Sequence, residues 1–428
     1  MATDFSQGSR IPAPKVGNVR WVIVGLLFAA TAINYVDRQM IGLLKPTLQS
    51  EFRWDETIYA DIVFWFQLAY AVGYMVFGNI VDRVGARIGY GLAFVIWTGA
   101  HMLHAIAHSV FGFGAVRFLL GIGESGNFPA GLKAVTEWFP KKERAFATGI
   151  FNAGSNVGAI ITPLVVPAIT LAYGWRAAFV ITGAVSLLWL VAWLTLYRRP
   201  RESKQLSGAE LAYIESDPAD PPAHVPWSRL IGRRETWAFA LGKFMTDPVW
   251  WMFLFWLPDF LVKRHHLDLK TFGPPLVIIY VVSDLGSIAG GWLSSRLIHQ
   301  GFTINRARKT TMLIAALCVT PIVFAQYVDS LWVAVAIISL ATAAHQAWSA
   351  NLYTLPSDMF PRKAVGSVIG IGGTAGAVGG MIFSLYIGQV LERLGTYSLI
   401  FYVAGSVYLV ALAIIHFLSP RLELARVA

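Results

Sequence analysis

Apolar runs long enough to cross a membrane recur along the whole chain. A helix that spans a bilayer needs about 20 predominantly apolar residues, because each residue adds about 1.5 Å of length. Twelve such spans are expected, at 20–44, 57–80, 88–108, 111–135, 146–171, 176–196, 236–262, 272–298, 308–327, 331–355, 364–391 and 397–418. The short alternating segments of a membrane β-barrel do not occur in this pattern. The chain is therefore predicted to be an all-α polytopic membrane protein.

Basic residues divide unequally between the two sides of this arrangement. Of the 34 Lys and Arg residues, 23 fall in the terminal tails and in the loops that share their side, and seven fall in the opposite loops. Cytoplasmic loops of membrane proteins are enriched in Lys and Arg, so both termini are expected in the cytoplasm. The formal net charge of +10 thus sets orientation, and no nucleic-acid partner is expected.

A polar, proline-containing segment separates the spans into two sets of six. The predicted organisation is an N-terminal six-helix bundle at 1–197, a cytoplasmic linker at 198–235 and a C-terminal six-helix bundle at 236–428. A short helix near Ser207–Ile214 is expected within the linker.

Within the fourth span, the apolar stretch around Gly121 contains two charged residues, Arg117 and Glu124, one on either side of this glycine. Seven residues make nearly two helical turns, so both charges lie on one stripe. A charge at the middle of a membrane costs about 2.5–3.5 kcal/mol on insertion scales, so this stripe must face protein or a wet cavity. One interpretation is an ion pair that joins helices. The other is a transport pathway, with an arginine for an anion and a carboxylate for a proton.

The first span carries Asp37 and Arg38 at comparable depth. Adjacent helical residues diverge by about 100° and cannot satisfy each other, so each needs another partner. We expect Asp37 to pair with Arg117, and Arg38 to pair with Glu124 or a bound anion. The alternative is that Asp37 and Arg38 reach the membrane surface from the helix end.

Polar and aromatic side chains in other spans are candidates for reading a hydroxylated ligand. Gln67, Tyr70 and Tyr74 follow i, i+3, i+7 spacing, which gives one polar-aromatic stripe. The candidate substrate-binding residues are Tyr35, Arg38, Gln67, Tyr70, Arg117, Asn156, Gln346, Trp348, Ser349 and Asn351. The candidate proton-coupling residues are Asp37 and Glu124.

For further polar residues within the spans, a structural role is at least as well supported as a functional one. Lys243 and Asp247 are four residues apart and can form an intrahelical pair. Asp284 suits a hydrogen bond between helices, and His345 suits a packed polar residue better than a proton carrier. The single cysteine, Cys318, indicates no disulfide or zinc site.

The segment from Gly78 to Arg87 resembles the loop motif of the major facilitator superfamily, G-x-x-x-D-R-x-G-x-R. Arg117 followed by Gly121 resembles the fourth-helix motif of the same superfamily, and Gly290–Arg296 resembles a second copy of the loop motif without its aspartate. The resemblance implies two pseudo-symmetric six-helix halves. It also implies a cytoplasmic gate formed by Gly78, Asp82, Arg83 and Arg87.

Three segments are similar to the anion:cation symporter branch of this superfamily: Asn34–Arg38, Gly121–Ala130 and Glu137–Pro140. Within that branch, Lys243–Pro248 and Trp250–Pro258 most resemble the hexuronate (galacturonate and glucuronate) transporters. The resemblance implies that Asp37 and Glu124 titrate with the transported proton. It implies that Arg38 and Arg117 bind the substrate carboxylate.

The expected function is import of an organic anion, a hexuronate or related sugar acid, by proton symport with alternating access across a cell inner membrane. The alternative within the same fold is an exchanger or facilitator for another carboxylate, such as tartrate, galactonate or an aromatic acid. A membrane-embedded enzyme is disfavoured, since no span shows a metal-ligand cluster, a nucleophile–base pair or a phosphate loop. We expect no cofactor, a monomer, and the organic anion, protons and the bilayer as the only partners.

Overall fold

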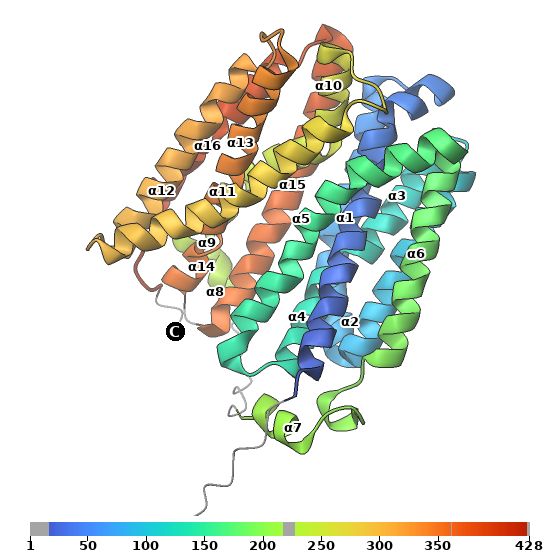
Figure 1. Ribbon diagram of the computed structural model, residues 1–428. Helices are drawn as coiled ribbons and strands as arrows, with labels where there is room; N and C mark the ends of the chain where they lie inside the picture. The colour runs from blue at the N-terminus through green and yellow to red at the C-terminus, as the bar shows by residue number, and fades with distance from the viewer. Residues whose placement is uncertain (1–16, 217–226, 361, 426–428) are drawn as a thin grey trace, which may run out of the picture.

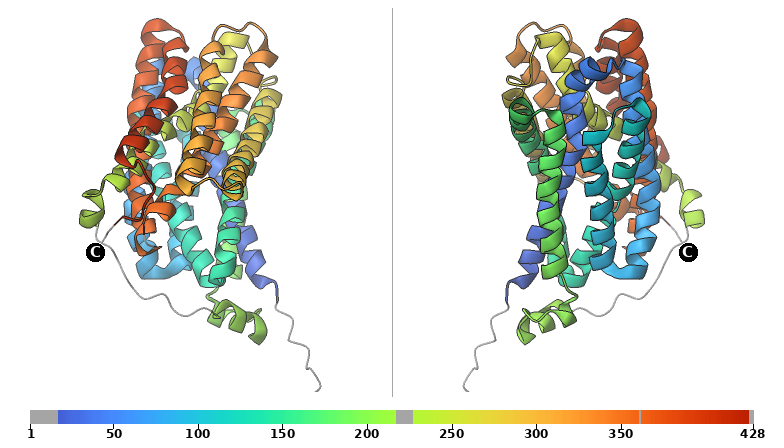
Figure 2. Two further views of the ribbon diagram at one scale, coloured as in Figure 1. Left: turned by 90° about the vertical axis from the view of Figure 1, so that its left-hand side faces the viewer. Right: turned by 90° about the vertical axis from the view of Figure 1, so that its right-hand side faces the viewer.

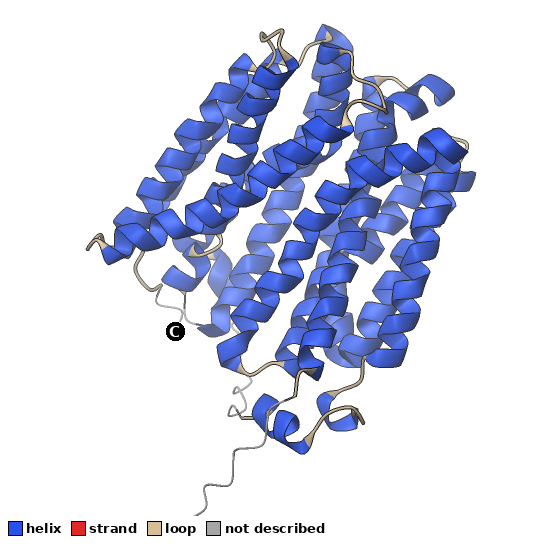
Figure 3. Ribbon diagram, viewed as in Figure 1, coloured by secondary structure: helices blue, strands red, loops and turns tan. Residues whose placement is uncertain are grey.

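The computed structural model describes residues 17–216, 227–360 and 362–425, and no strand occurs in these ranges (Figure 3). The helices are α1 (Val19–Phe52), α2 (Glu56–Leu103), α3 (Val110–Glu124), α4 (Asn127–Trp138), α5 (Lys141–Tyr173), α6 (Trp175–Leu196), α7 (Gly208–Ile214), α8 (Trp227–Ile231), α9 (Arg234–Phe255), α10 (Leu257–His265), α11 (Gly273–His299), α12 (Ile304–Val319), α13 (Leu331–Leu352), α14 (Leu355–Met359), α15 (Arg362–Leu394) and α16 (Ser398–Leu418). The all-α prediction is confirmed.

Nine helical segments within the described ranges are long and apolar enough to cross a membrane, and they match nine of the expected spans. The third expected span is the part of α2 that follows Gly85. The fourth and seventh expected spans are each divided, into α3 with α4 and into α9 with α10. Together these helices account for the twelve predicted crossings.

Two of these three irregularities have identifiable reasons. Gly85 has a φ of 82°, a left-handed conformation that glycine adopts without the penalty of a Cβ atom, and it turns the chain within α2. Between α9 and α10, the backbone departs from regular helical geometry at Trp256, which has a φ of −118°, two residues before Pro258. Proline has no N–H for a helical hydrogen bond, so the break at this point follows from the sequence.

The helices form two groups, which Figures 1 and 2 show side by side: α1–α6 in blue to green, and α9–α16 in yellow to red. Glycines allow the helices within each group to pack closely. Gly154 and Gly158 of α5 lie against the backbone of α1, and Gly286 and Gly290 of α11 lie against α13. Large apolar side chains on the outward faces, such as Leu188 and Ile288, are exposed, as a lipid-facing surface requires.

The two groups meet mainly through α2 with α15 and through α5 with α11. At these contacts Gly388 of α15 lies against Ala60, and Gly273 lies against Pro163. We call the end of the bundle that carries α7 and the start of α1 the linker end, and the opposite end the distal end (Figure 1).

The linker helix α7 is the short helix expected from the sequence, and its N-cap is Ser207. It lies against the linker end of α1 through Glu210, whose carboxylate accepts hydrogen bonds from the backbone N–H groups of Val19 and Arg20. Arg20 also forms ion pairs with Glu210 and with Glu143 of α5. A carboxylate at a helix N-terminus satisfies orphan N–H groups and complements the helix dipole, so α7 is fixed to the first group.

The glycine contacts predict opposite effects for two substitutions on α11. Gly286→Ala places a Cβ against the Ala343 backbone, and overpacking of this kind lowers the free energy of unfolding by about 1–3 kcal/mol. Gly291→Ala meets open space and should be neutral, or stabilising by about 0.5–1 kcal/mol through helix propensity. Thermal unfolding of the purified protein in detergent measures both, and equal melting temperatures would contradict the packing argument.

Candidate functional site

Arg38 of α1 lies at the centre of the bundle in an ion pair with Glu124, the last residue of α3. Its Nε lies 2.8 Å from Glu124 Oε2, and its Nη2 donates to Asn34 Oδ1 at 3.0 Å. Glu124 is fully buried and Arg38 is 4% exposed. The Arg38–Glu124 pair predicted from the sequence is therefore confirmed. Such a pair gains Coulomb energy but loses hydration, so its net contribution to stability is small.

Aromatic rings surround the Arg38 guanidinium on its remaining sides. Its central carbon lies 4.8 Å from the Tyr70 ring, 4.9 Å from Tyr35 and 5.3 Å from Trp251. Trp251 belongs to α9, so the second group of helices completes this arrangement. Ring faces attract a cation at these distances and stabilise it where water is scarce. Tyr35, Tyr70 and Trp251 are each partly exposed, so the rings do not enclose the guanidinium completely.

Arg117 of α3 is fully buried, and none of its guanidinium nitrogens forms a hydrogen bond with any described residue. Its closest stabilising neighbour is the Phe66 ring, 4.4 Å from the guanidinium carbon. The predicted ion pair with Asp37 does not form. An arginine with five unpaired donors in an apolar environment is an unsatisfied site for an anion.

Asp37 has a different neighbour from the one predicted. Its Oδ1 lies 3.3 Å from His101 Nε2 on α2, and Trp97 lies beside the same carboxylate. Because Asp37 and Arg38 are adjacent on one helix, about 100° apart, the rotation of α1 that directs Arg38 to Glu124 brings Asp37 beside His101 and not into an ion pair with Arg117. The sequence offered one signal for His101, which is an ionisable residue within an apolar span.

The other candidate substrate-binding residues are of two kinds: some lie at the contact between the groups or are partly exposed, and others are packed within the second group. Gln67 is buried at the contact between the groups, where its Oε1 accepts from Ser384 at 3.2 Å and its Nε2 has no partner among the described residues. Asn156, Gln346 and Ser349 are partly exposed.

Trp348 and Asn351 are instead packed within the second group. Trp348 Nε1 donates to Thr246 at 3.1 Å, and Asn351 Nδ2 donates to backbone carbonyls on α11 and α13. Both are buried and have no free face, so the structure does not bring them to Arg38. Trp251 is the tryptophan that lies at Arg38, and within the aromatic Trp250–Pro258 segment the sequence did not distinguish it.

Another buried cation, Lys243, lies on α9. Lys243 Nζ lies 2.7 Å from Asp247 Oδ2, as the four-residue spacing predicted, and donates to the Tyr353 hydroxyl at 2.8 Å. His345 stacks on Trp250 and contacts the Tyr408 hydroxyl at 2.5 Å, which makes it a packed polar residue. No cluster of His, Cys, Asp or Glu within the described ranges has the composition of a metal site.

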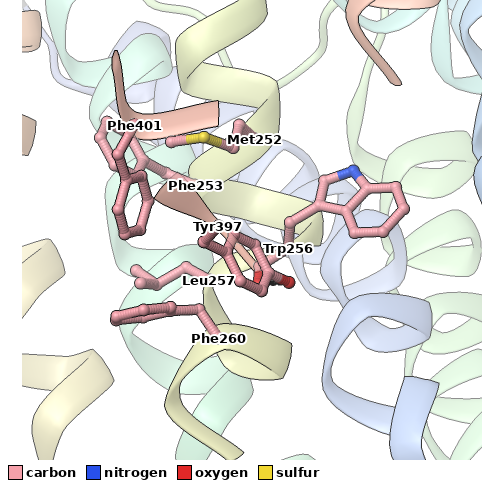
Figure 4. A pocket seen from close by; sticks show the side chains of 7 residues that line it. All are labelled: Met252, Phe253, Trp256, Leu257, Phe260, Tyr397 and Phe401. Carbon is pink, nitrogen blue, oxygen red and sulfur yellow. Dashed lines mark hydrogen bonds between the residues drawn. The ribbon is translucent and has the colours of Figure 1, made fainter. Parts of the chain in front are cut away.

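Four charged residues close the distal end, and they form one network between the two groups. Lys45 Nζ lies 2.7 Å from Glu56 Oε2 and 2.8 Å from Asp259 Oδ2 of α10. Lys263 pairs with the same two carboxylates, at 2.5 and 3.1 Å. The Tyr397 hydroxyl donates to Asp259 Oδ2 and lies 3.2 Å from the Trp256 carbonyl oxygen. Its ring packs on Phe260 (Figure 4). The apolar space between these rings does not admit a water molecule, so it is packing and not a ligand site.

At the linker end, the residues of the loop motif lie on and around the turn at Gly85. Arg87 Nη2 donates to the Leu194 carbonyl at 2.6 Å, which satisfies an orphan acceptor at the end of α6. Arg83 is exposed, Gly78 has open space around its Cα, and the Asp82 side chain lies outside the described part of the structure. Each described hydrogen bond or ion pair between the two helix groups lies at the distal end or at the depth of the central arginines.

Comparisons with known proteins agree with this architecture. The family model of the Major Facilitator Superfamily matches residues 27–384. Over 390 residues the chain is 33% identical to the hexuronate transporter of Escherichia coli strain K12, covering 89% of this chain and 90% of the relative. Over 310 residues it is 33% identical to the galacturonate transporter of Dickeya chrysanthemi, covering 71% and 90% of the two chains.

A solved structure shows the same fold. A bacterial homolog of the human lysosomal transporter Spinster, in an inward-facing and occupied conformation, superposes with a TM-score of 0.71 at 19% identity, covering 95% of this chain and 98% of that one. With the family match over most of the chain and two relatives at one-third identity, the chain is a multi-pass membrane transporter, not an enzyme, and belongs to the Major Facilitator Superfamily.

Proposed function

We propose that this protein imports a hexuronate or a related sugar acid across the cell inner membrane by proton symport with alternating access. The observation that carries the proposal is the pair of buried arginines, Arg38 held by Glu124 and Arg117 without any described anionic partner. A buried guanidinium favours a bidentate carboxylate ligand, because two parallel charged hydrogen bonds satisfy its donors. The relatives named for hexuronate and galacturonate support the substrate class.

Coupling follows from the balance of charge at the centre. Asp37 and Glu124 oppose Arg38 and Arg117, so the empty site is close to neutral. Protonation of a carboxylate leaves an arginine without its counter-ion, and the substrate carboxylate then restores neutrality. A neutral site is less costly to enclose than a charged one, so the transporter changes state when proton and anion are both present or both absent.

The hydroxyl groups of the sugar have polar partners on both helix groups. Tyr35, Gln67, Tyr70 and Asn156 serve from the first group, and Gln346 and Ser349 serve from the second, while Trp251 offers a ring face. Trp348 and Asn351 are not part of this proposal, because both are enclosed by packing.

Alternating access uses the two ends of the bundle. In the proposed orientation both termini are cytoplasmic and the distal end faces outward. The network of Lys45, Glu56, Asp259 and Lys263 then closes the outer side, while the loop with Asp82, Arg83 and Arg87 controls opening at the cytoplasmic side. Two halves, 1–197 and 236–428, move about the central site, joined by the linker 198–235. A monomer contains all of these parts.

The proton assignment predicts the behaviour of Asp37→Asn. This variant retains a polar side chain of the same shape but cannot bind and release a proton. In proteoliposomes it should lose galacturonate accumulation driven by an imposed pH gradient, while counterflow exchange continues. Full retention of gradient-driven accumulation would contradict proton symport and favour an exchanger or facilitator.

The anion assignment predicts the behaviour of Arg117→Gln. Hydrogen bonds to a charged group contribute about 1.5–3 kcal/mol, so galacturonate should bind roughly 10- to 100-fold more weakly. Arg176→Gln, which removes an exposed arginine at the distal end, is the matched control and should bind normally. Ligand-induced thermal stabilisation of the purified protein measures both. Stabilisation of the wild type by galactose but not by galacturonate would overturn the assignment.

The distal network predicts that Lys45→Met opens the outer side. Removal of one partner from a buried ion pair destabilises it by about 3–5 kcal/mol, because the other charges stay buried. With Ala60→Cys as a reporter beneath the network and Cys318→Ser to remove the native thiol, labelling by an impermeant maleimide should accelerate at least about tenfold (1.4 kcal/mol). Glu210→Gln at the linker end, in the same reporter background, is the control. Equal labelling rates in the reporter background alone, with Lys45→Met and with Glu210→Gln would contradict closure of the outer side by the network.

A further inference from the structure

Asp37 and Arg38 face different parts of the structure, although they are adjacent in the chain. Arg38 lies among the rings of Tyr70 and Trp251, where the two helix groups meet. Asp37 lies inside the α1–α6 group and is fully buried, and neither of its carboxylate oxygens has a hydrogen bond of normal geometry to a described residue. Asp37, one of the two proposed proton-coupling carboxylates, is therefore set apart from Arg38, and His101 lies beside it.

The hydrogen bonds around His101 determine which of its nitrogens carries a proton. Thr182 on α6 donates its hydroxyl proton to the Ala178 carbonyl at 2.7 Å, so its oxygen accepts from His101 Nε2 at 2.8 Å. Nε2 therefore carries a hydrogen in the neutral ring, which Thr182 accepts, and Asp37 Oδ1 lies 3.3 Å from the same nitrogen. Nδ1 then has a free lone pair, and it has no hydrogen-bond partner in the described structure.

His104, one turn further along, provides a comparison. Its Nδ1 donates to the backbone carbonyls of Ala100 and His101, and its ring stacks on Phe179 with centroids 4.8 Å apart. The ring of His104 lies 6.3 Å from that of His101 and forms no described contact with Asp37. Two buried histidines thus lie on the same helix, and one of them faces the carboxylate.

Few other charged groups act on the pair. Glu124 and Arg117, both on α3, are close enough to Asp37 to interact electrostatically, and Arg117 and His104 are close enough to His101. Arg38, on α1 beside Asp37, is neutralised by Glu124. The residues of α6 that face His101 are Thr182 and Phe179, neither of which titrates.

We propose that Asp37 and His101 bind the transported proton as a pair. The proton resides either on the Asp37 carboxyl group or on Nδ1 of His101, and in the second state the imidazolium faces the carboxylate as an ion pair. This proposal rests on the proposed proton symport and adds a second titrating residue to it. His101 acts here through Asp37 and does not touch the substrate.

The pair has a definite consequence for pH dependence. Two interacting groups that share one proton have two ways of holding it, so they bind it more tightly than Asp37 alone beside a side chain that cannot titrate. His101→Gln leaves an N–H near the position of Nε2 but accepts no proton. Lower proton affinity means that more acid is needed, so the midpoint of pH-dependent uptake moves to lower pH, by about 0.3 units if the two residues hold the proton equally and by more if His101 holds it more tightly.

The experiment compares wild type, His101→Gln and His104→Asn in proteoliposomes. Initial rates of galacturonate uptake are measured across external pH, and counterflow is measured at equal pH on both sides. His101→Gln should shift the uptake midpoint to acid and keep counterflow within about twofold (0.4 kcal/mol) of wild type. His104→Asn preserves the N–H to the backbone carbonyls and should keep the wild-type midpoint.

If His101→Gln keeps the wild-type uptake midpoint, or if His104→Asn shifts that midpoint equally, Asp37 and His101 do not bind the proton as a pair. His101→Asn is a second non-titrating variant for which the same acid shift is expected, so poor insertion of one variant leaves the test intact. The failure of symport itself looks different. In that case wild-type uptake would not respond to pH, and Asp37→Asn would accumulate substrate as the wild type does.

Discussion

The main constraint on the centre of this structure is the burial of the guanidinium groups of Arg38 and Arg117 in an apolar helix bundle. An isolated buried charge costs several kcal/mol even after the protein relaxes, so each arginine must have a compensating neighbour. Arg38 has a carboxylate, an amide oxygen and aromatic ring faces. Arg117 has the ring faces of Phe66 and Phe255 but no hydrogen bond to a described residue, so its compensation is incomplete. The difference between these two environments is what makes the centre receptive to an anion.

One helix distributes the polar residues among separate environments. Along α1, Asp37 faces the interior of the first helix group, Arg38 faces the second group, and Lys45 lies in the ion network at the distal end. The angle of about 100° between adjacent residues separates the first two, and the rise of 1.5 Å per residue places Lys45 about 10 Å from Arg38 along the axis. A rotation or tilt of α1 would therefore change all three environments together.

The sequence predicted features that depend on local spacing or on an unavoidable need for compensation. The Lys243–Asp247 pair follows from one helical turn, and a partner for Arg38 follows from the energy of burial. What the sequence did not specify is how each helix is rotated about its axis. In a span that is apolar on every side, periodicity does not distinguish the lipid-facing side from the side that faces protein. For this reason the sequence did not predict that His101, and not Arg117, lies beside Asp37. It also did not predict that Trp251, and not Trp348, lies beside Arg38.

The charge network at the distal end has a consequence for turnover. Its two lysines and two carboxylates gain attraction inside the protein but lose their hydration, and the two effects nearly cancel in buried ion pairs. The network therefore fixes the geometry of the closed end but adds little to its free energy of closure, whereas a large apolar surface would add much more. The open and closed forms can then remain nearly isoenergetic, so that the binding energy of a small solute suffices to choose between them.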